Sequence, residues 1–457
     1  MSLSAASAAD LSQTGPNASA ASLIAARGHV QEPALEFVYK VEGGKPDTIT
    51  VDLAEDFSVL QQGNELYIYD FALHRLITLD DSTHSFENTS LYSMVEYFYA
   101  ETYNRHVQYG ALSAAKLAQH VDMLDPFWVQ SNLHIVSPEF GTPKIDRRSA
   151  ADGSVHFSYG GAEVASYKSS EHAMTKDEGA RLARFLRFYS SIHPVIIDDI
   201  VASGHLPQHL SFEGVSTTKL PTTIWTLQSA TPVKAAYPLR AGYKVMPPKL
   251  EGAVGTLVPV VQSAVAGQAP GRRGVSDYRS AIEAAMAAEK PFQAMVLALE
   301  LSEQFGKPAT DCADAKGCHS LKDIVAAAGA DTRTPALLKA LGDPTPQKDD
   351  AIKVLQAMKR GDLSNAYVLD EFLADDLVAA DRSSEALPLF VGAIKGNPYL
   401  AGYYKDIGDL FRVGFQAQTA WYFYDMGRML PRGPDAPVIS EMNRYEADLA
   451  KRFPEFF

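Results

Sequence analysis

The sequence predicts an α+β fold: an N-terminal antiparallel sheet, open-barrel-like and accompanied by helices, followed by an all-α helical-repeat domain. Between residues 34 and 228, short runs of alternating hydrophobic residues are separated by short links, several of which contain glycine, which is typical of strands in consecutive antiparallel order. From residue 276 onward, nearly every segment has helical periodicity. The 457 residues also exceed what one compact core usually holds, so at least two domains are expected.

The predicted sheet region contains two blocks of strands, each followed by helical pattern. Strands are expected at residues 34–41, 48–53, 65–70, 75–79, 155–159, 163–167, 210–212 and 222–228. Helices are expected at residues 91–117, 176–191 and 194–203. Thr175 is a suitable capping residue for the second of these helices. Glu178 follows at the third position after it, which is the spacing of a capping box.

These patterns divide the chain into four parts. Residues 1–31 are rich in alanine and serine at their start and are expected to be disordered. Residues 32–246 form the α+β domain. Residues 247–275 contain glycine, proline, alanine and valine with few charges and are interpreted as a linker. Residues 276–457 form the helical-repeat domain.

The charge balance limits the classes of partner. A formal net charge of −14 and a pI of about 5.3 disfavour nucleic acid, because an acidic surface repels phosphate backbones. No apolar run reaches the roughly 18 residues that a membrane span needs, so the chain is not predicted to be transmembrane. The start of the chain does not form an intact signal peptide. Two interpretations remain: a cytoplasmic protein with a flexible start, or a periplasmic or secreted protein whose signal was removed.

The two cysteines lie close together in one loop. Cys312 and Cys318 are separated by a short stretch that includes Gly317. They are best interpreted as a local disulfide, which indicates an oxidising compartment. Two free thiols in a cytoplasmic loop remain the alternative. A zinc site is not expected, because His319 is the adjacent ligand and a fourth is not evident.

Motifs that carry catalytic chemistry are largely missing. The sequence has no Walker A loop, no dinucleotide fingerprint, no nucleophile elbow and no His-Glu-x-x-His helix, and no cofactor is predicted. The alternative is a metal site formed by His205, His209 and Asp198 or Asp199, near His193. It would make the protein a hydrolase or metal-dependent enzyme. Surface or capping histidines around a loop are the simpler interpretation.

The last helices resemble a tetratricopeptide repeat in the order of their large, small and proline positions. The residues that carry the resemblance are Tyr404, Gly408, Phe411, Ala420, Tyr424 and Pro431. The spacing from Pro398 to Pro431 is close to the period of such repeats, which is about 34 residues. The resemblance implies stacked helix pairs that bind a partner protein or peptide in a groove. Aromatic residues are the candidate binding residues, with a packed repeat core as the simpler role: Tyr403, Phe415, Trp421 and Tyr424.

The N-terminal region is similar to the open β-barrel domains of LolA-like periplasmic lipoprotein carriers. The similarity lies in the paired runs 64–70 and 75–79, with Tyr69-Asp70 at the hairpin, and in residues 222–229 followed by 237–243. It implies a curved sheet wrapped over helices, an apolar concavity and an envelope location. It implies no catalytic residue.

The sequence therefore predicts a non-catalytic envelope protein that acts as a binding or scaffold protein. Its helical repeats are expected to bind a protein or peptide partner. Its N-terminal sheet is expected to hold an apolar ligand such as a lipid. The alternatives are the enzyme with a site near residues 193–209 and a cytoplasmic scaffold.

Overall fold

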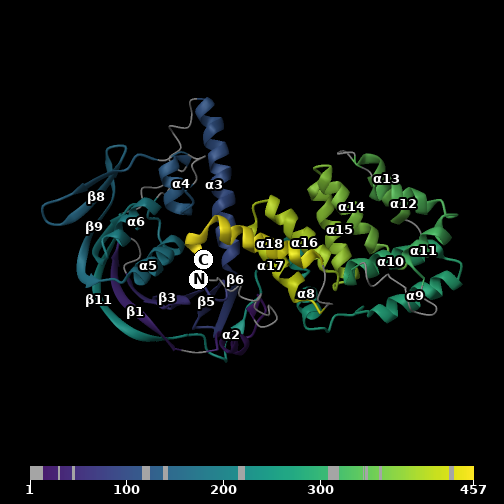
Figure 1. The fold of residues 1–457 in the computed structure, drawn as a ribbon, viewed down its shortest axis with the longest axis horizontal. Helices are drawn as coiled ribbons and strands as arrows, with labels where there is room; N and C mark the ends of the chain where they lie inside the picture. Colours follow the sequence, from purple (N-terminus) through teal and green to yellow (C-terminus); the bar gives the residue numbers. More distant parts are fainter. Residues whose placement is uncertain are drawn as a thin grey trace. The chain divides into compact units, whose positions relative to one another are not determined.

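The computed structural model describes residues 14–28, 31–43, 47–115, 124–136, 141, 143–214, 222–306, 319–342, 344, 348–359, 363–431 and 437–457. The chain forms two compact units. Unit 1 comprises Met1–Met246 together with Ala447–Phe457, and unit 2 comprises Pro247–Glu446. A sheet dominates unit 1 and helices make up unit 2 (Figure 1), so the predicted α+β class is confirmed.

The sheet of unit 1 has twelve strands within the described residues, in the order β12-β6-β5-β4-β3-β2-β1-β11-β10-β9-β8-β7. Neighbouring strands are antiparallel except β12, which pairs with β6 in parallel, so the sheet is mixed rather than wholly antiparallel as predicted. The strands are β1 Gln31–Glu42, β2 Asp47–Leu53, β3 Phe57–Gln62, β4 Glu65–Asp70, β5 Arg75–Asp80, β6 Ser85–Ser90, β7 Asp146–Ser149, β8 Ser154–Tyr159, β9 Ala162–Ala173, β10 His205–Phe212, β11 Thr223–Ala236 and β12 Lys244–Val245.

Helix α5 (Lys176–Tyr189) packs on the inner face of this sheet, which curves around α5 and α6 (Pro194–Ala202) (Figure 1). The predicted capping box is present: Glu178 N donates to Thr175 Oγ1, and the Glu178 carboxylate accepts from Thr175 N. The ring of Phe185 is fully buried and lies 6.5 Å from Phe37 and 6.3 Å from Tyr69. Aromatic side chains of α5 therefore cover the middle of the concave face that was expected to hold an apolar ligand.

The sheet also carries α2 (Ala20–Arg27). Leu23 of this helix is fully buried and belongs to a hydrophobic cluster with residues of β3, β4 and β5. The buried guanidinium of Arg27 lies 2.5 Å from Glu32 and 3.5 Å from Asp70. Asp70 also accepts from Tyr237 Oη at 2.9 Å. These paired charges fasten α2 to the sheet.

Two further helices and the C-terminal segment complete unit 1. The helices are α3 (Leu91–Ala114) and α4 (Pro126–Leu133). The short 3-10 helix η5 (Pro454–Phe456) places the fully buried ring of Phe456 5.4 Å from Phe188 of α5 and 6.0 Å from Phe98 of α3. The next residue, Phe457, stacks on Tyr92 at 4.7 Å.

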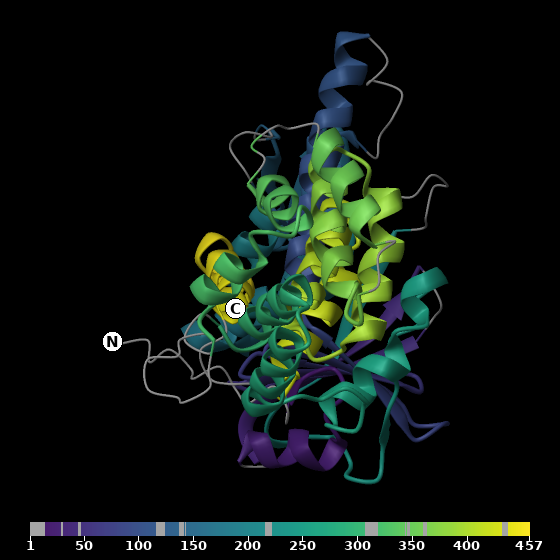
Figure 2. The same ribbon diagram turned by 90° about the vertical axis from the view of Figure 1, so that its right-hand side faces the viewer.

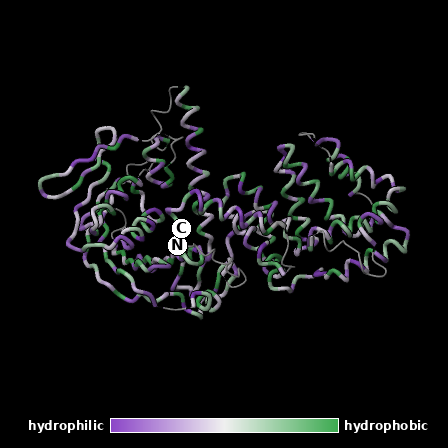
Figure 3. Tube along the Cα trace, viewed as in Figure 1, coloured by the Kyte–Doolittle hydropathy of each residue, from purple (hydrophilic) through white to green (hydrophobic). Residues whose placement is uncertain are grey.

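Unit 2 is built from helices (Figure 2), and hydrophobic and hydrophilic residues are interspersed along them (Figure 3). Its helices within the described residues are α7 Gly252–Gly255, α8 Val258–Val265, α9 Val275–Ala287, α10 Pro291–Phe305, α11 Leu321–Ala328, α12 Arg333–Leu341, α13 Asp349–Lys359, α14 Tyr367–Ala379, α15 Ser383–Gly396, α16 Ala401–Val413 and α17 Ala417–Met429. Helix α18 (Pro437–Arg452) contains the boundary between the units.

Three helix pairs of unit 2 share one geometry. The spacing between the first residues of the two helices is the same in each pair, namely Val275 to Pro291, Tyr367 to Ser383 and Ala401 to Ala417. The turn between the helices has one left-handed residue at the same place: Glu289, Asp381 and Phe415, with φ of 56°, 60° and 59°. The last two pairs follow each other at the tetratricopeptide period of about 34 residues. The geometry therefore repeats although the sequence signature is strong in the last pair alone.

Glycines allow the helices of the last pair to approach closely. A Cβ on Gly408 would lie 2.3 Å from the ring of Tyr424, and one on Gly427 would lie 2.9 Å from Tyr404. Both distances are shorter than atoms tolerate, so only glycine fits at these positions. Small residues facing large ones are thus the basis of α16–α17 packing, as the order of residues in the sequence indicated.

Two predicted segments differ from the structure. The interpretation of residues 1–31 as disordered is wrong for residues 14–28, because the ion pairs of Arg27 and the burial of Leu23 order α2. The interpretation of residues 247–275 as a linker is also wrong. Leu257 and Val261 are fully buried in unit 2, and their helical spacing was obscured by the surrounding glycines and prolines.

Replacing Arg27 by alanine tests how α2 is held. The change removes the cationic partner of the buried carboxylates of Glu32 and Asp70, and loss of one partner of a buried ion pair typically costs about 3–5 kcal/mol. We expect chemical denaturation to show a loss of this size for unit 1. The exposed pair formed by Arg147 and Asp199 is the control; Arg147→Ala should cost less than about 1 kcal/mol. Equal losses in the two variants would contradict this account of Arg27.

Candidate functional site

The histidines of residues 193–209 do not converge. His193 is the N-cap of α6, where its Nδ1 accepts from Val195 N and its Nε2 faces Gln130 Oε1 at 3.1 Å. His205 and His209 lie in β10 rather than in a loop, because Pro207 sits at an irregularity of the β9–β10 pairing. His205 contacts Ser203 O, and His209 contacts Thr226 Oγ1.

The carboxylates of this region are occupied elsewhere. Asp199 accepts from Arg147 and from Tyr167, each at 2.7 Å, and Asp198 pairs with Arg187 at 2.9 Å. Among the described residues, no group of three or more His, Cys, Asp or Glu side chains is arranged to hold a metal ion. The geometry therefore gives the predicted alternative site no support.

Two buried histidines instead make unit 1 sensitive to acid. Burial lowers the pKa of His134 to about 4 and that of His193 to about 3. Both histidines are therefore neutral in the folded protein at pH 7, whereas they take up protons near pH 6.5 once unfolded. The stability that they contribute is present above pH 6.5 and is lost as the pH falls.

His193→Asn tests this acid sensitivity. Asparagine can still cap α6 but carries no titratable ring. The wild-type protein should lose about 2 kcal/mol through His193 between pH 7 and pH 5, since each pKa unit corresponds to about 1.4 kcal/mol. The variant should therefore show a shallower pH dependence of unfolding free energy, and His209→Asn, an exposed site, should leave it unchanged. An unchanged slope in His193→Asn would contradict the assignment.

The aromatic residues predicted to bind a partner divide into two groups. Trp421 and Tyr424 are buried in the α16–α17 core, and Tyr424 Oη donates to Asp409 at 2.5 Å. Tyr403 is also fully buried, but its hydroxyl has no hydrogen-bond partner. Phe415 is 46% exposed in the turn between α16 and α17. Trp421 and Tyr424 thus pack in the core of the repeat, which was the simpler of the two interpretations.

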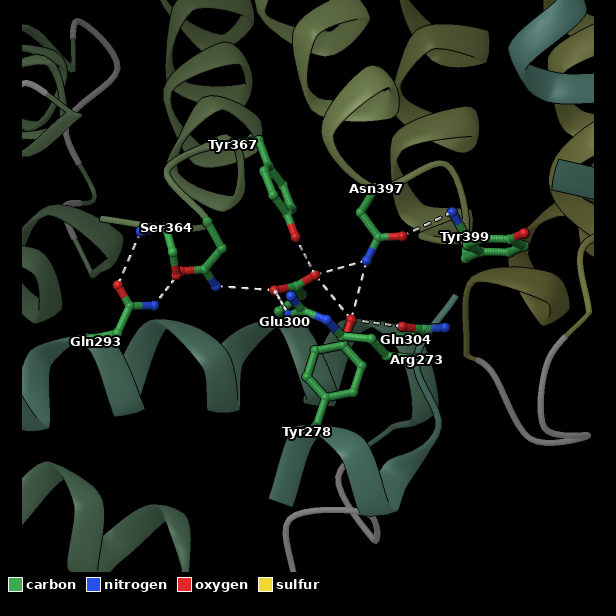
Figure 4. A network of polar contacts seen from close by, with 10 residues as sticks. Arg273, Tyr278, Gln293, Glu300, Gln304, Ser364, Tyr367, Asn397 and Tyr399 are labelled. Atoms are coloured by element: carbon green, nitrogen blue, oxygen red, sulfur yellow. Dashed lines mark hydrogen bonds and ion pairs between the residues drawn. The ribbon is translucent and has the colours of Figure 1, made fainter. Parts of the chain in front are cut away.

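A fully paired carboxylate, Glu300, lies at the centre of the polar network drawn in Figure 4. Its buried side chain accepts from Tyr278 of α9 at 2.9 Å, from Tyr367 of α14 at 2.6 Å and from Asn397 at 2.7 Å. Asn365 donates to its other oxygen at 3.0 Å. The partners come from several segments, so this network fixes α10 relative to α9, α14 and the end of α15.

Beyond this network, carboxylates from three helices form what we call the acidic cluster. Its members are Glu303 of α10, Glu371 and Asp375 of α14, and Asp406 and Asp409 of α16. Glu303 lies one turn after Glu300, and Glu371 one turn before Asp375, so each helix presents its acids over successive turns of one face. Glu303 and Asp375 are exposed, whereas Glu371 is 5% exposed.

Gly402 marks where two of these carboxylates approach each other. A Cβ on Gly402 would lie 3.2 Å from Glu371 Oε1 and 3.7 Å from Glu303 Oε2. Both acids therefore lie over the first turn of α16, whose N-terminus favours negative charge. Their mutual repulsion is on the order of 1–2 kcal/mol after allowance for solvent screening of the exposed Glu303.

The crowding changes the acidity of the cluster. Burial, together with the charges of Glu303 and Asp406, raises the pKa of Glu371 well above its ordinary value. Although the side chain of Asp375 is exposed in part, the packed helices desolvate its carboxyl group and raise its pKa to about 7, with Asp376 and Glu303 adding to the effect against the opposing charge of Lys405.

Lys405, the cation beside the cluster, is already committed to other carboxylates. It contacts Asp409 at 2.7 Å, Glu441 at 3.4 Å and Asp406 at 3.6 Å. Glu371 Oε2 has no hydrogen-bond partner. The Tyr403 hydroxyl lies close enough to lower the pKa of Glu371 slightly, yet no hydrogen bond of ordinary geometry forms. Two buried polar groups are thus left without partners beside an excess of negative charge.

Sequence reasoning assigned these acids no role. The one-turn spacing of Asp375 from Glu371 was a usable signal. The contribution of Glu303 from α10 depends on the Glu300 network, which no local pattern shows. The cysteines Cys312 and Cys318 lie outside the described residues, so their predicted disulfide stays a prediction.

No protein-family model matches this chain, and no curated protein and no solved structure shows significant similarity to it. Within the described part of the chain, none of the helices has the length and apolar character that a membrane crossing requires.

Glu371→Gln and Glu300→Gln make a matched pair that separates the acidic cluster from the paired network. At pH 8 we expect Glu371→Gln to raise the unfolding free energy of unit 2 by about 1–2 kcal/mol, because it removes repulsion. The gain should be smaller at pH 5, because burial raises the pKa of Glu371 and protonation removes the repulsion. Glu300→Gln should destabilise unit 2, since it places an amide donor among donors. Calorimetry at the two pH values measures both effects.

The pH dependence of unit 2 follows from the same cluster. A carboxyl group whose pKa is raised on folding stabilises the protein below its unfolded pKa, and this stability is lost as the pH rises through the folded value. Because of Asp375, the unfolding free energy of unit 2 should fall as the pH rises from 4 to 8. Asp375→Asn should make this fall smaller. A loss of stability in Glu371→Gln at pH 8, or an unchanged decline in Asp375→Asn, would contradict this interpretation.

Proposed function

We propose that this chain is a non-catalytic binding protein whose helical unit recognises a protein partner at the acidic cluster. The observation that carries the proposal is the pair of unpartnered buried groups, Glu371 Oε2 and Tyr403 Oη. Buried polar groups are almost always paired, so unpaired ones beside like charges indicate a site that a ligand completes. The neighbouring Glu303 and Asp375 are exposed and within reach of a partner.

The repeated helix pairs support this proposal. The two pairs that begin at Tyr367 and Ala401 share the period of tetratricopeptide repeats. Stacked repeats of this kind form extended concave binding surfaces. The cluster takes Glu371 and Asp375 from α14 and Asp406 from α16, which are the first helices of the two pairs.

An envelope location and an apolar ligand of the sheet remain part of the proposal as predicted from the sequence. The location rests on Cys312 and Cys318 and on the resemblance to LolA-like carriers. The apolar ligand has weaker support, because Phe185 and its neighbours on α5 cover the concave face of the sheet. The geometry gives the enzyme alternative no support, since Asp199 and His205 have separate partners.

Site-specific photo-crosslinking in cells of the native source tests the binding proposal. A benzophenone amino acid placed at Glu303 or Asp375, both exposed, should crosslink to the same protein partner. The same probe at Glu283, an exposed acid on α9 outside the cluster, is the matched control and should not. Crosslinks of equal yield at all three positions, or at none, would overturn the proposed function.

A further inference from the structure

We propose that the acidic cluster binds a lysine or arginine side chain of the partner polypeptide. This inference rests on the proposed function and deepens it, because it names the chemical group that the site takes.

The negative charge of the acidic cluster favours a cationic ligand. The cluster has five carboxylates from three helices, and Lys405 is already paired with Asp406, Asp409 and Glu441. Another lysine of the described residues, Lys348, forms an ion pair with Asp376 of α14, with 3.5 Å between Nζ and Oδ1. An ammonium or guanidinium group beside Glu303 and Asp375 supplies the missing opposite charge. Such a group also stabilises the charged form of the neighbouring Glu371.

The geometry favours an organic cation over a metal ion. A metal needs several ligand atoms at about 2.0–2.6 Å from one point, and no group of described acids is arranged in this way. Glu371 and Glu303 both border the position that a Cβ on Gly402 would take, and they reach it from different helices. A primary ammonium with three donors, or the planar fork of a guanidinium, can reach carboxylates arranged in this manner.

Exposed apolar residues beside the cluster favour a polypeptide over a small polyamine. Val378 lies one turn after Asp375 on α14 and is 37% exposed. Val413 lies one turn after Asp409 on α16 and is 76% exposed, and Phe415 lies just beyond it. Residues one turn apart share a helix face. A chain with basic and apolar side chains matches this mixed surface, whereas a polyamine has no apolar group of suitable size.

Binding of the cation is coupled to proton release. The cation favours the charged form of the acids, so carboxyl groups whose pKa is raised in the free protein lose protons when it binds. Affinity should therefore rise with pH, most steeply near pH 7 for Asp375. The titratable and charged groups that face Glu371 and Asp375 from the packed helices are Glu303 of α10, Asp376 of α14, and Lys405, Asp406 and Asp409 of α16.

Selection from a random dodecapeptide library on the full-length protein tests the inference. Lysine or arginine together with aliphatic residues should be enriched in the selected peptides. Acetylation of the selected lysine, or its replacement by norleucine, should weaken binding at least tenfold in calorimetry. Glu371→Gln and Asp375→Asn should each weaken binding several-fold, while Glu283→Gln, which removes the same charge elsewhere, should not. Proton uptake and release, measured in buffers of different ionisation enthalpy, should show release on binding.

Several results would overturn the inference. If the selected peptides lack basic residues, or bind equally well after acetylation, the site does not recognise a cationic side chain. Spermidine binding as tightly as the peptides would assign the site to a polyamine, and saturable Ca²⁺ binding that Glu371→Gln abolishes would assign it to a metal. Affinity that is constant or falls between pH 5.5 and pH 8 would remove the proton coupling. If crosslinking at Glu303 still identifies one partner, the proposed function stands although the basic side chain is wrong.

Discussion

The carboxylate of Glu300 holds together the helices from which the acidic cluster is built. It accepts hydrogen bonds from Tyr278, Tyr367 and Asn397, which lie on three separate segments. A buried carboxylate with all its partners is stable, and loss of any one partner leaves a charge without full compensation. Because α10 is fixed in this way, Glu303 one turn further along is brought to Gly402 and Glu371.

Two buried acids, Glu300 in this network and Glu371 beside it, thus have opposite environments. Glu300 is satisfied by four donors, whereas Glu371 faces other carboxylates and has an oxygen without a partner. A fold rarely keeps such a conflict unless another molecule resolves it, since most residues of a stable protein agree with their surroundings. Glu300 therefore has a structural role. Glu371, with one unpaired oxygen, lowers the stability of unit 2.

Local patterns were sufficient for much of the fold. Alternation in β1, β2, β4 and β5 and the capping box at Thr175 predicted these strands and α5, because these features depend on neighbouring residues. The helix near Arg27 was missed, since it depends on the distant charges of Glu32 and Asp70. The acidic cluster was missed for the same reason. Its acids come from α10, α14 and α16, and their meeting follows from Glu300 rather than from any spacing in the sequence.

Unit 1 consists of two separated stretches of chain with all of unit 2 between them. Its aromatic core includes Phe456, which lies against Phe188 and Phe98. During synthesis the ribosome completes the helical unit before it makes this segment. Unit 2, whose contacts are mostly between neighbouring helices, can fold as it emerges. The sheet unit, although most of its residues are made first, is therefore the last to be finished, and its aromatic surface stays uncovered until Phe456 arrives.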